Sequence, residues 1–383
     1  MTKKIFRALL CTVLAALLLS GCAVVKIPVQ DETKERFPVT EMEQFGKYKH
    51  YFSALGEEEK AAYNCILRQI EEFPERIEVP VLSSQQLEKV WLALMYDNPQ
   101  LFMLGRECGI NVIDDSGYFY CDYALSKADY EKKKALLEAR VSSIEDDLSK
   151  LSSAFEKELY IHDMIIDSCG YVSSDDLINS TVCGVLLNGE ASCEGYAKAA
   201  KLLLDAAGVE NFLICGTARR ETGESEGHMW NVVIIDGKPY NLDLTWDDPI
   251  GESVQKNKRY AYFNVTDEEI QKTHSFADAP AGCTERTENY FVKTGRQFDS
   301  YDSEMRSSLA GIISKNETDG KFDIRFSSQQ AYDSAKKGLF ENEDIYRVLE
   351  LAALSSKASF STTQIRYISD DTHLILEIIT VAE

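Results

Sequence analysis

Residues 188–197 read Asn188-Gly189-Glu190-Ala191-Ser192-Cys193-Glu194-Gly195-Tyr196-Ala197. Ser192 belongs to the residue types that cap helix N-termini, and Gly208 is suited to end a helix. Between them apolar residues recur at helical spacing, at Tyr196, Ala199, Ala200, Leu203, Leu204 and Ala207. We therefore predict a helix with Cys193 in its first turn. Helix N-termini attract negative charge, and the thiolate is the nucleophilic form of cysteine, so this stretch suggests a reactive thiol.

A β-hairpin is predicted downstream of this helix. Two β-rich runs, His228–Ile235 and Lys238–Trp246, are separated only by Asp236-Gly237. An Asp-Gly pair between two such runs is a strong signal for a two-residue hairpin turn. Such a turn fixes the register and pairs Ile235 with Lys238.

This register predicts a contact between a histidine and an aspartate. It makes Trp230 face Asp243 and His228 face Thr245, so that all four side chains share one face of the hairpin. His228 and Asp243 are then diagonal neighbours within hydrogen-bonding reach. Pro239 removes one ladder donor, and a bulge there would shift the register.

These residue types fit nucleophilic catalysis by a thiol. Cys193 would be the nucleophile, His228 the base, and Asp243 the group that orients the imidazole and stabilises its charged form. An oxyanion hole would use the Cys193 backbone N–H together with a side-chain donor, for which Asn188 and Tyr171 are the candidates. His162 and His274 are expected to serve structure, although the loop that carries His274 could reach the rim of the cleft.

The three residues stand in recognisable motifs. The chain has Gly-x-x-x-Cys-x-Gly-Tyr-Ala around Cys193, His-x-Trp-Asn at His228 and Asp-x-Thr-Trp at Asp243. In this order they resemble the transglutaminase-like superfamily, most closely its bacterial secreted branch, over about residues 151–298. The resemblance implies a papain-like α+β fold, in which a cysteine-bearing helix packs on an antiparallel sheet that carries the histidine and the aspartate. It implies no cofactor.

The resemblance indicates a chemistry more closely than a substrate, because the superfamily includes protein-crosslinking enzymes, peptidases and deglycosylating amidases. We expect an enzyme that cleaves peptide-like amides of protein or peptidoglycan-peptide substrates through an acyl-enzyme. The acidic polar loop Arg219–Gly227, directly before His228, favours an open, wet rim and therefore hydrolysis over amine transfer. The alternative is a lipid-anchored protein that binds cell-wall or protein ligands and catalyses no reaction.

The N-terminus carries targeting information. Three cations precede the apolar run Ala8–Leu19, which is short for a membrane span, and Leu19-Ser20-Gly21-Cys22 is typical of a lipoprotein cleavage site. We predict a signal peptide at 1–21, lipidation of Cys22 and a tether at 22–45. The protein is then anchored in the cell membrane on its extracytoplasmic side.

The composition limits the partners of the chain. Its 41 Lys and Arg face 63 Asp and Glu, a formal charge of −22, which speaks against nucleic acid as a partner. No Cys-x-x-Cys or Cys/His spacing suggests a metal site. Of the ten cysteines, Cys108 and Cys121 flank a predicted turn at 114–117 and could form a disulfide across a hairpin.

Three folded units are predicted, each of the α+β type. An N-terminal unit at 46–150 and a small C-terminal unit at 301–383 flank the catalytic domain at 151–300. The predicted helices are 57–73, 84–97 with Ser84 as cap, 127–168 with a break near 149–153, 329–340 and 344–354. The predicted strands outside the catalytic domain are 101–104, 110–113, 118–123, 322–326, 362–368 and 372–381.

The lipid anchor is tested by the substitution Cys22→Ala. Without the thiol that receives the lipid, the protein should move from the membrane fraction to the soluble fraction, which immunoblotting of fractionated cells measures. A membrane fraction equal to that of the wild type would contradict the predicted lipidation.

Overall fold

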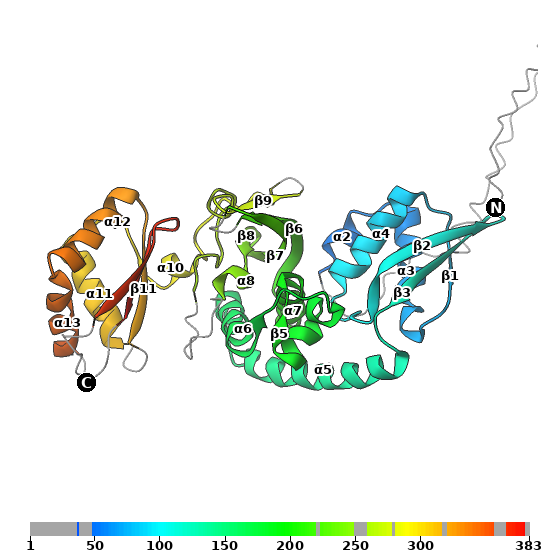
Figure 1. Ribbon diagram of the computed structural model, residues 1–383, viewed down its shortest axis with the longest axis horizontal. Coiled ribbons are helices and arrows are strands. Elements are labelled where there is room, and N and C mark those ends of the chain that lie inside the picture. The colour runs from blue at the N-terminus through cyan, green and yellow to red at the C-terminus, as the bar shows by residue number, and fades with distance from the viewer. Residues whose placement is uncertain are drawn as a thin grey trace, which may run out of the picture.

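The computed structural model describes residues 37, 48–219, 223–248, 259–277, 280–315, 320–355 and 365–379. The predicted signal peptide and Cys22 lie outside the described residues, as does all of the predicted tether except residue 37. Along the longest axis of the molecule, Figure 1 shows an N-terminal group of elements, a central group and a C-terminal group. Within the described parts, no helix has both the length and the apolar character needed to cross a membrane.

The central group is built on a four-stranded sheet in the order β8-β7-β6-β9, with every neighbouring pair antiparallel. Helix α7 packs on β6 and β7, and α6 packs against α7 (Figure 1). The predicted α+β class, with a cysteine-bearing helix on an antiparallel sheet, is confirmed. The elements of this group are α6 Ala154–Ser168, β4 Gly170–Tyr171, η2 Leu177–Ser180, η3 Gly184–Asn188, β5 Glu190–Ala191, α7 Cys193–Ala206, β6 Glu210–Arg219, β7 Ser225–Ile235, β8 Lys238–Leu242, α8 Leu244–Asp247, α9 Asp267–Ile270, β9 His274–Phe276 and α10 Tyr290–Lys293.

Helix α7 begins at the nucleophile candidate, as predicted, and is held by burial of its apolar face. Tyr196, Leu203 and Leu204 are fully buried, and each buried leucine contributes roughly 1.5–3 kcal/mol. The helix ends before Gly208, which has a φ of 75°. Ser192 occupies the N-cap position, but the predicted side-chain cap is wrong. Its hydroxyl instead contacts Ser180 Oγ at 3.1 Å, because η2 lies beside the start of α7.

The hairpin forms as predicted at its turn but ends earlier than predicted. Ile235 pairs with Lys238, and Asp236 and Gly237 have φ values of 52° and 72°, as a two-residue turn requires. The ladder stops at Leu242. The predicted pairings of Trp230 with Asp243 and of His228 with Thr245 are therefore wrong. The physical reason is that the Asp243 carboxylate caps α8, accepting from the Thr245 backbone N–H at 2.9 Å and from that of Trp246 at 3.2 Å.

The polar loop before His228 is shorter than predicted. Strand β6 continues to Arg219, which pairs with Ser225 at the start of β7. Glu221 lies outside the described residues, and residues 223–227 are exposed. The loop is thus the end of a long two-stranded ladder whose acidic side chains Glu224 and Glu226 face solvent.

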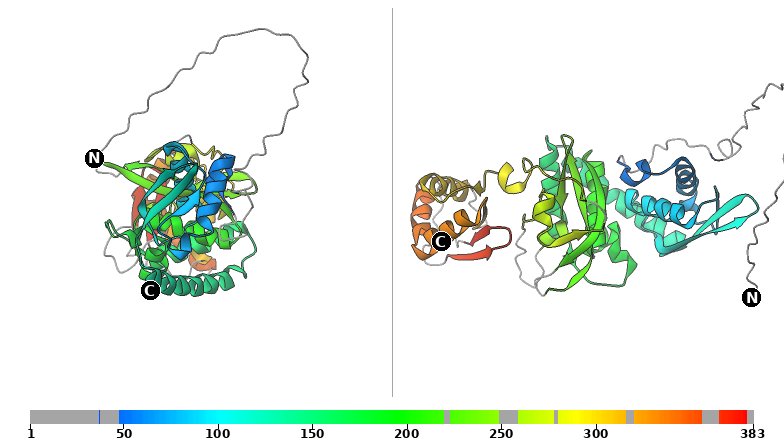
Figure 2. Two further views of the ribbon diagram at one scale, coloured as in Figure 1. Left: turned by 90° about the vertical axis from the view of Figure 1, so that its right-hand side faces the viewer. Right: turned by 90° about the horizontal axis from the view of Figure 1, so that it is seen from above.

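The N-terminal group consists of helices packed on a three-stranded sheet in the order β1-β3-β2 (Figure 2). Helix α4 is capped by Ser83 rather than Ser84, because Gln86 completes a reciprocal capping pair with Ser83. The predicted strand at 101–104 is wrong except for Leu104, and β1 was not predicted. The elements are α2 His50–Ser53, α3 Glu57–Leu67, η1 Ile70–Glu72, β1 Ile77–Val79, α4 Ser84–Asp97, β2 Leu104–Ile113, β3 Ser116–Tyr123 and α5 Lys127–Leu148.

Cys108 and Cys121 lie directly opposite each other on β2 and β3. The hairpin therefore brings them together as predicted. Both thiols are free in this structure.

The N-terminal and central groups share one hydrophobic core, which runs from Leu55 to Phe291 and also includes Ile375. A second core, from Met305 to Ile378, belongs to the C-terminal group, whose sheet has the order β10-β11-β13-β12. Helix α11 of this group was not predicted. Its elements are β10 Gln297–Phe298, α11 Ser303–Lys315, β11 Lys321–Phe326, α12 Gln329–Lys336, η4 Lys337–Glu341, α13 Asp344–Ser355, β12 Arg366–Asp370 and β13 Ile375–Ile379.

The close packing at the start of α7 predicts the effect of Gly195→Ala. A Cβ at this position would lie 2.4 Å from Asn179 O and 2.9 Å from Ala191 Cβ. We expect destabilisation by ~1–3 kcal/mol, because one of these neighbours has to shift. Urea unfolding followed by tryptophan fluorescence measures it, since Trp230 and Trp246 lie in the same core.

The matched control is Gly227→Ala on β7, where no atom lies within 4 Å of the added Cβ. This control should change the free energy of unfolding by no more than ~0.5 kcal/mol. Equal effects of the two substitutions would contradict the packing argument.

Candidate active site

The Asp243 carboxylate is the central acceptor of the candidate site. It is almost fully buried, and its Oδ2 lies 2.6 Å from Nε2 of His228. An ionised carboxylate can only accept, so His228 Nε2 carries the hydrogen of this bond. Strand β7 positions the histidine, and the first turn of α8 positions the aspartate.

The second nitrogen of His228 faces the nucleophile candidate. Cys193 lies close enough to the imidazole to raise its pKa. Because Nε2 is taken by Asp243, Nδ1 is the nitrogen that remains for the thiol. The structure thus brings Cys193, His228 and Asp243, all predicted from the sequence, to one place from α7, β7 and the start of α8.

The charges in this chain favour a protonated His228. Burial opposes protonation, but the Asp243 carboxylate and the neighbouring Cys193 outweigh it and raise the pKa of His228 to about 10. Burial likewise acts to raise the pKa of Asp243, but the two neighbouring histidines hold it well below its usual range. At neutral pH the site therefore contains a buried imidazolium paired with a carboxylate.

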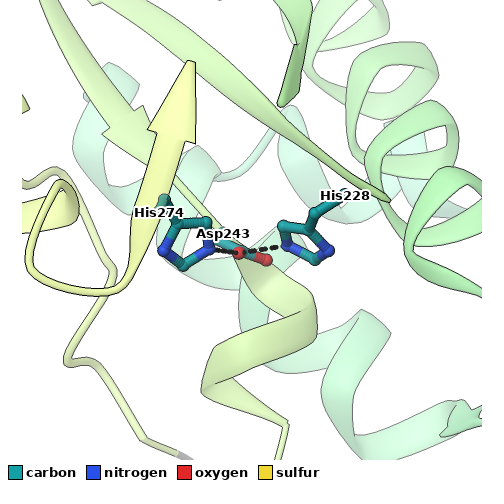
Figure 3. A group of neighbouring side chains, drawn as sticks. All are labelled: His228, Asp243 and His274. Carbon is teal, nitrogen blue, oxygen red and sulfur yellow. Dashed lines mark hydrogen bonds and ion pairs between the residues drawn. The ribbon is translucent and has the colours of Figure 1, made fainter. Parts of the chain in front are cut away.

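His274 is a third member of this cluster that the sequence analysis did not assign to the site. It begins β9, is buried, and places Nε2 3.0 Å from the same Asp243 Oδ2 (Figure 3). Figure 3 shows the two imidazoles on opposite sides of the carboxylate. His274 is the first residue of β9, so its position depends on how β9 pairs with β6. That pairing leaves no signal in the local sequence.

The same three side chains have the residue types of a metal site. The ligand atoms of His228, Asp243 and His274 lie within 4.8 Å of one another. A metal ion would need the lone pairs of both Nε2 atoms. In this structure each Nε2 lies within hydrogen-bonding distance of Asp243 Oδ2, at 2.6 Å for His228 and 3.0 Å for His274.

Comparison with protein families assigns the central part of the chain. Residues 142–244 match the transglutaminase-like superfamily. The chain carries a transglutaminase-like domain. The match contains Cys193, His228 and Asp243, ends one residue after the aspartate, and leaves His274 outside. The resemblance inferred from the three motifs is confirmed for this domain.

Three solved structures are similar to the chain at low sequence identity. A candidate cysteine protease from Cytophaga hutchinsonii is 16% identical, with a TM-score of 0.25 over 28% of this chain and 37% of its own. A TGase is 16% identical, with a TM-score of 0.27 over 48% of this chain and 54% of its own. A candidate protease from Parabacteroides distasonis ATCC 8503 is 10% identical, with a TM-score of 0.22 over 72% of this chain and 61% of its own.

The chain thus spans less than two thirds of the length of each of these three proteins. Comparison with curated proteins gave no match.

Both oxyanion candidates of the transglutaminase-like domain lie on the segments next to the nucleophile. Tyr171 pairs with Ala191 in the short β4–β5 ladder that leads into Cys193. Asn188 is the last residue of η3, and only Gly189 separates it from the start of β5. Cys193 is the first residue of α7, where the backbone N–H has no acceptor within the helix. Both candidates therefore lie on the short segments that lead into the nucleophile.

The N-terminal group contributes side chains beside the nucleophile. Arg106 on β2 reaches Ser180 Oγ at 3.3 Å and lies 3.8 Å from the carboxylate of Glu194, the residue after Cys193. Tyr96 on α4 contacts the Cys215 thiol at 3.2 Å. One side of the transglutaminase-like domain is therefore bordered by the N-terminal sheet and helix α4.

A further buried histidine, His162, supports the end of α8. His162 on α6 is fully buried and contacts the carboxylates of Asp163 at 3.0 Å and Asp247 at 3.2 Å. Burial opposes its protonation, but these carboxylates raise the pKa of His162 to about 9. Its contacts fix the end of α8 and do not reach Cys193, as expected for a structural histidine.

The charge state of His228 can be tested with Asp243→Asn. The substitution removes the carboxylate charge that outweighs the effect of burial on the pKa of His228. This pKa should therefore fall from about 10 to below its ordinary value of 6.5. In the wild type, protonation of His228 stabilises the folded protein. This contribution to the free energy of unfolding is fully present below pH 6.5 and is lost as the pH rises through about 10. NMR titration of the imidazole resonances measures the shift.

Turnover of the Asp243→Asn variant should fall by orders of magnitude while circular dichroism stays unchanged. A His228 that still titrates near pH 10 in this variant would contradict the pairing with Asp243.

Proposed function

We propose that this chain is a cell-surface thiol enzyme that cleaves peptide-like amides through an acyl-enzyme on Cys193. The observation that carries the proposal is the His228 imidazole, which is hydrogen-bonded to Asp243 at 2.6 Å through Nε2 and has Cys193 near enough to raise its pKa. Members of the transglutaminase-like superfamily are in general cysteine-dependent enzymes, which agrees with this reading.

The proposed reaction starts from a thiolate beside an imidazolium. The Cys193 thiolate attacks the amide carbonyl, and the backbone N–H of Cys193 stabilises the resulting oxyanion. His228 then gives its Nδ1 proton to the amine, which leaves as the C–N bond breaks. Asp243 keeps the imidazole oriented and compensates its charge throughout these steps.

The thioester that remains is resolved by water in our proposal. His228 removes a proton from the water as its oxygen attacks the thioester carbonyl, and the carboxylic acid leaves as the C–S bond breaks. A transferase has to admit an amine while excluding water. The rim next to His228 is formed by the exposed residues 223–227, with Glu224 and Glu226 in solvent, which favours access of water.

The proposed place of action is the outer face of the cell membrane, with protein or peptidoglycan-peptide substrates. The support for this location is the lipoprotein cleavage sequence before Cys22, outside the described residues. The acidic rim would repel acidic substrates and favour neutral or basic ones.

Thiol labelling separates an enzyme from a protein that only binds ligands. At neutral pH, Cys193 should react with iodoacetamide faster than the other cysteines, and His228→Ala should remove this advantage. Mass spectrometry of tryptic peptides gives the rate at each cysteine. The activated thiol would be contradicted, and a binding protein favoured, if Cys193 reacted no faster than Cys65 or Cys215 and its rate were the same in His228→Ala.

The choice between water and amine is tested with a glutamine-containing protein and a fluorescent amine. The soluble domain should release ammonia or new chain ends from the substrate, and incorporate little amine, with Cys193→Ala as the inactive control. Efficient Cys193-dependent incorporation of the amine without hydrolysis would show a transglutaminase instead.

A further inference from the structure

We propose that His274 is a positioning residue of this site, which holds Asp243 in place as the ionised acceptor of His228. The inference rests on the proposed function, because it concerns the same thiol chemistry. His274 lies outside the residues that match the transglutaminase-like superfamily, on a strand that follows Asp243 by about thirty residues.

Both oxygens of the Asp243 carboxylate are fully occupied by hydrogen bonds. Its Oδ1 accepts from the backbone N–H groups of Thr245 and Trp246, and its Oδ2 accepts from both histidines. A carboxylate has about four acceptor positions, so all are filled by four donors. His274 donates the one bond that comes from neither the hairpin nor α8, and so it ties the carboxylate to the far edge of the sheet.

His274 donates through Nε2, because the ionised Asp243 carboxylate 3.0 Å away can only accept. Its other nitrogen, Nδ1, lies 2.8 Å from Thr273 Oγ1, which also lies 3.1 Å from the hydroxyl of Tyr262. Both ring nitrogens of His274 therefore have polar partners, which fix the orientation of the imidazole.

Aromatic rings enclose the contact between His274 and Asp243 and exclude water from it. The His274 ring packs against Trp246 at 4.8 Å, Trp230 at 5.3 Å and Tyr262 at 5.4 Å between ring centroids. Burial lowers the pKa of His274, more than the carboxylate raises it, and the nearby His228 lowers it further. His274 therefore donates as a neutral imidazole, and the single positive charge of the trio stays on His228.

These contacts predict what His274 contributes. In a site without water, the loss of its N–H leaves one carboxylate lone pair unpaired and one side of Asp243 unsupported. The carboxylate becomes easier to protonate and freer to rotate away from the plane of His228. Both changes weaken the hold on the imidazole that faces Cys193.

Other ionisable groups surround this carboxylate and have to be kept constant in a test. Asp247 on α8 interacts electrostatically with it and is hydrogen-bonded to His162, and Tyr262, from the segment before α9, interacts with it as well. From the C-terminal group, the His373 ring contacts Tyr262 and Asp370 bonds His373. None of these side chains is changed in the variants below.

The test measures the rate of Cys193 alkylation by iodoacetamide as a function of pH, in His274→Leu and His274→Gln. Leucine removes the donor, whereas glutamine retains an N–H that can reach Asp243. In the leucine variant we expect a rate lowered roughly 10- to 100-fold at neutral pH, the loss of one hydrogen bond to a charged group. The glutamine variant should recover most of this loss, and His50→Leu, on α2 away from the site, should match the wild type.

The pH profile distinguishes positioning from packing. Asp243 is ionised above its depressed pKa, and its support of His228 is lost as the pH falls through that value. The acid limb of the alkylation profile follows protonation of the reacting thiolate, which the imidazolium held by Asp243 opposes. Because His274 supports Asp243, this limb should move to higher pH in His274→Leu and return in His274→Gln. A purely structural role would lower the rate in both variants without moving the limb.

A second variant keeps the test decisive if His274→Leu does not fold. Thr273→Val leaves the histidine in place but removes the hydroxyl next to Nδ1, and it should move the acid limb in the same direction by a smaller amount. Wild-type profiles in both His274→Leu and Thr273→Val would overturn the proposal. A wild-type Cys193 without any rate advantage would instead overturn the proposed function, which makes the two failures distinguishable.

Discussion

The hydrogen bond between the Asp243 carboxylate and the His228 imidazole is the contact on which the candidate site depends. It connects the end of the hairpin to the central strand of the sheet in a place from which water is excluded. A buried carboxylate is costly unless its oxygens are fully paired, and here the paired groups come from β7, α8 and β9. The folding of the sheet and the assembly of the site are therefore the same event, because the carboxylate can be buried only when all three elements are in place.

The electrostatics of the site follow from this burial. Two histidines share one carboxylate oxygen, but only one of them is positioned to exchange a proton with a thiol. Burial and the nearby charge of His228 lower the pKa of His274. Asp243 and Cys193 instead raise the pKa of His228. The asymmetry places the mobile proton on the side of the carboxylate that faces α7, which is where thiol chemistry would need it.

The surroundings of the transglutaminase-like domain shape access to this site. The N-terminal group shares its hydrophobic core and brings Arg106 and Tyr96 to the side of the nucleophile helix. The C-terminal group has a core of its own, and it contacts the domain behind the trio, where Arg325 pairs with Glu269 and His373 packs on Tyr262. One flanking group thus borders the nucleophile helix, and the other borders the residues around Tyr262 and Glu269.

The sequence by itself determined the elements whose signals are local. Helical spacing after Cys193, the Asp-Gly turn and the three motifs were sufficient for the cysteine-bearing helix, the hairpin and the order of Cys193, His228 and Asp243. Only the tertiary structure decided that Asp243 ends the ladder and caps α8, because a capping carboxylate and a strand residue look alike in sequence. It also decided that His274 joins the trio, since that contact depends on which strand lies at the edge of the sheet. Pairing between strands distant along the chain is set by packing of the whole core, and no single segment encodes it.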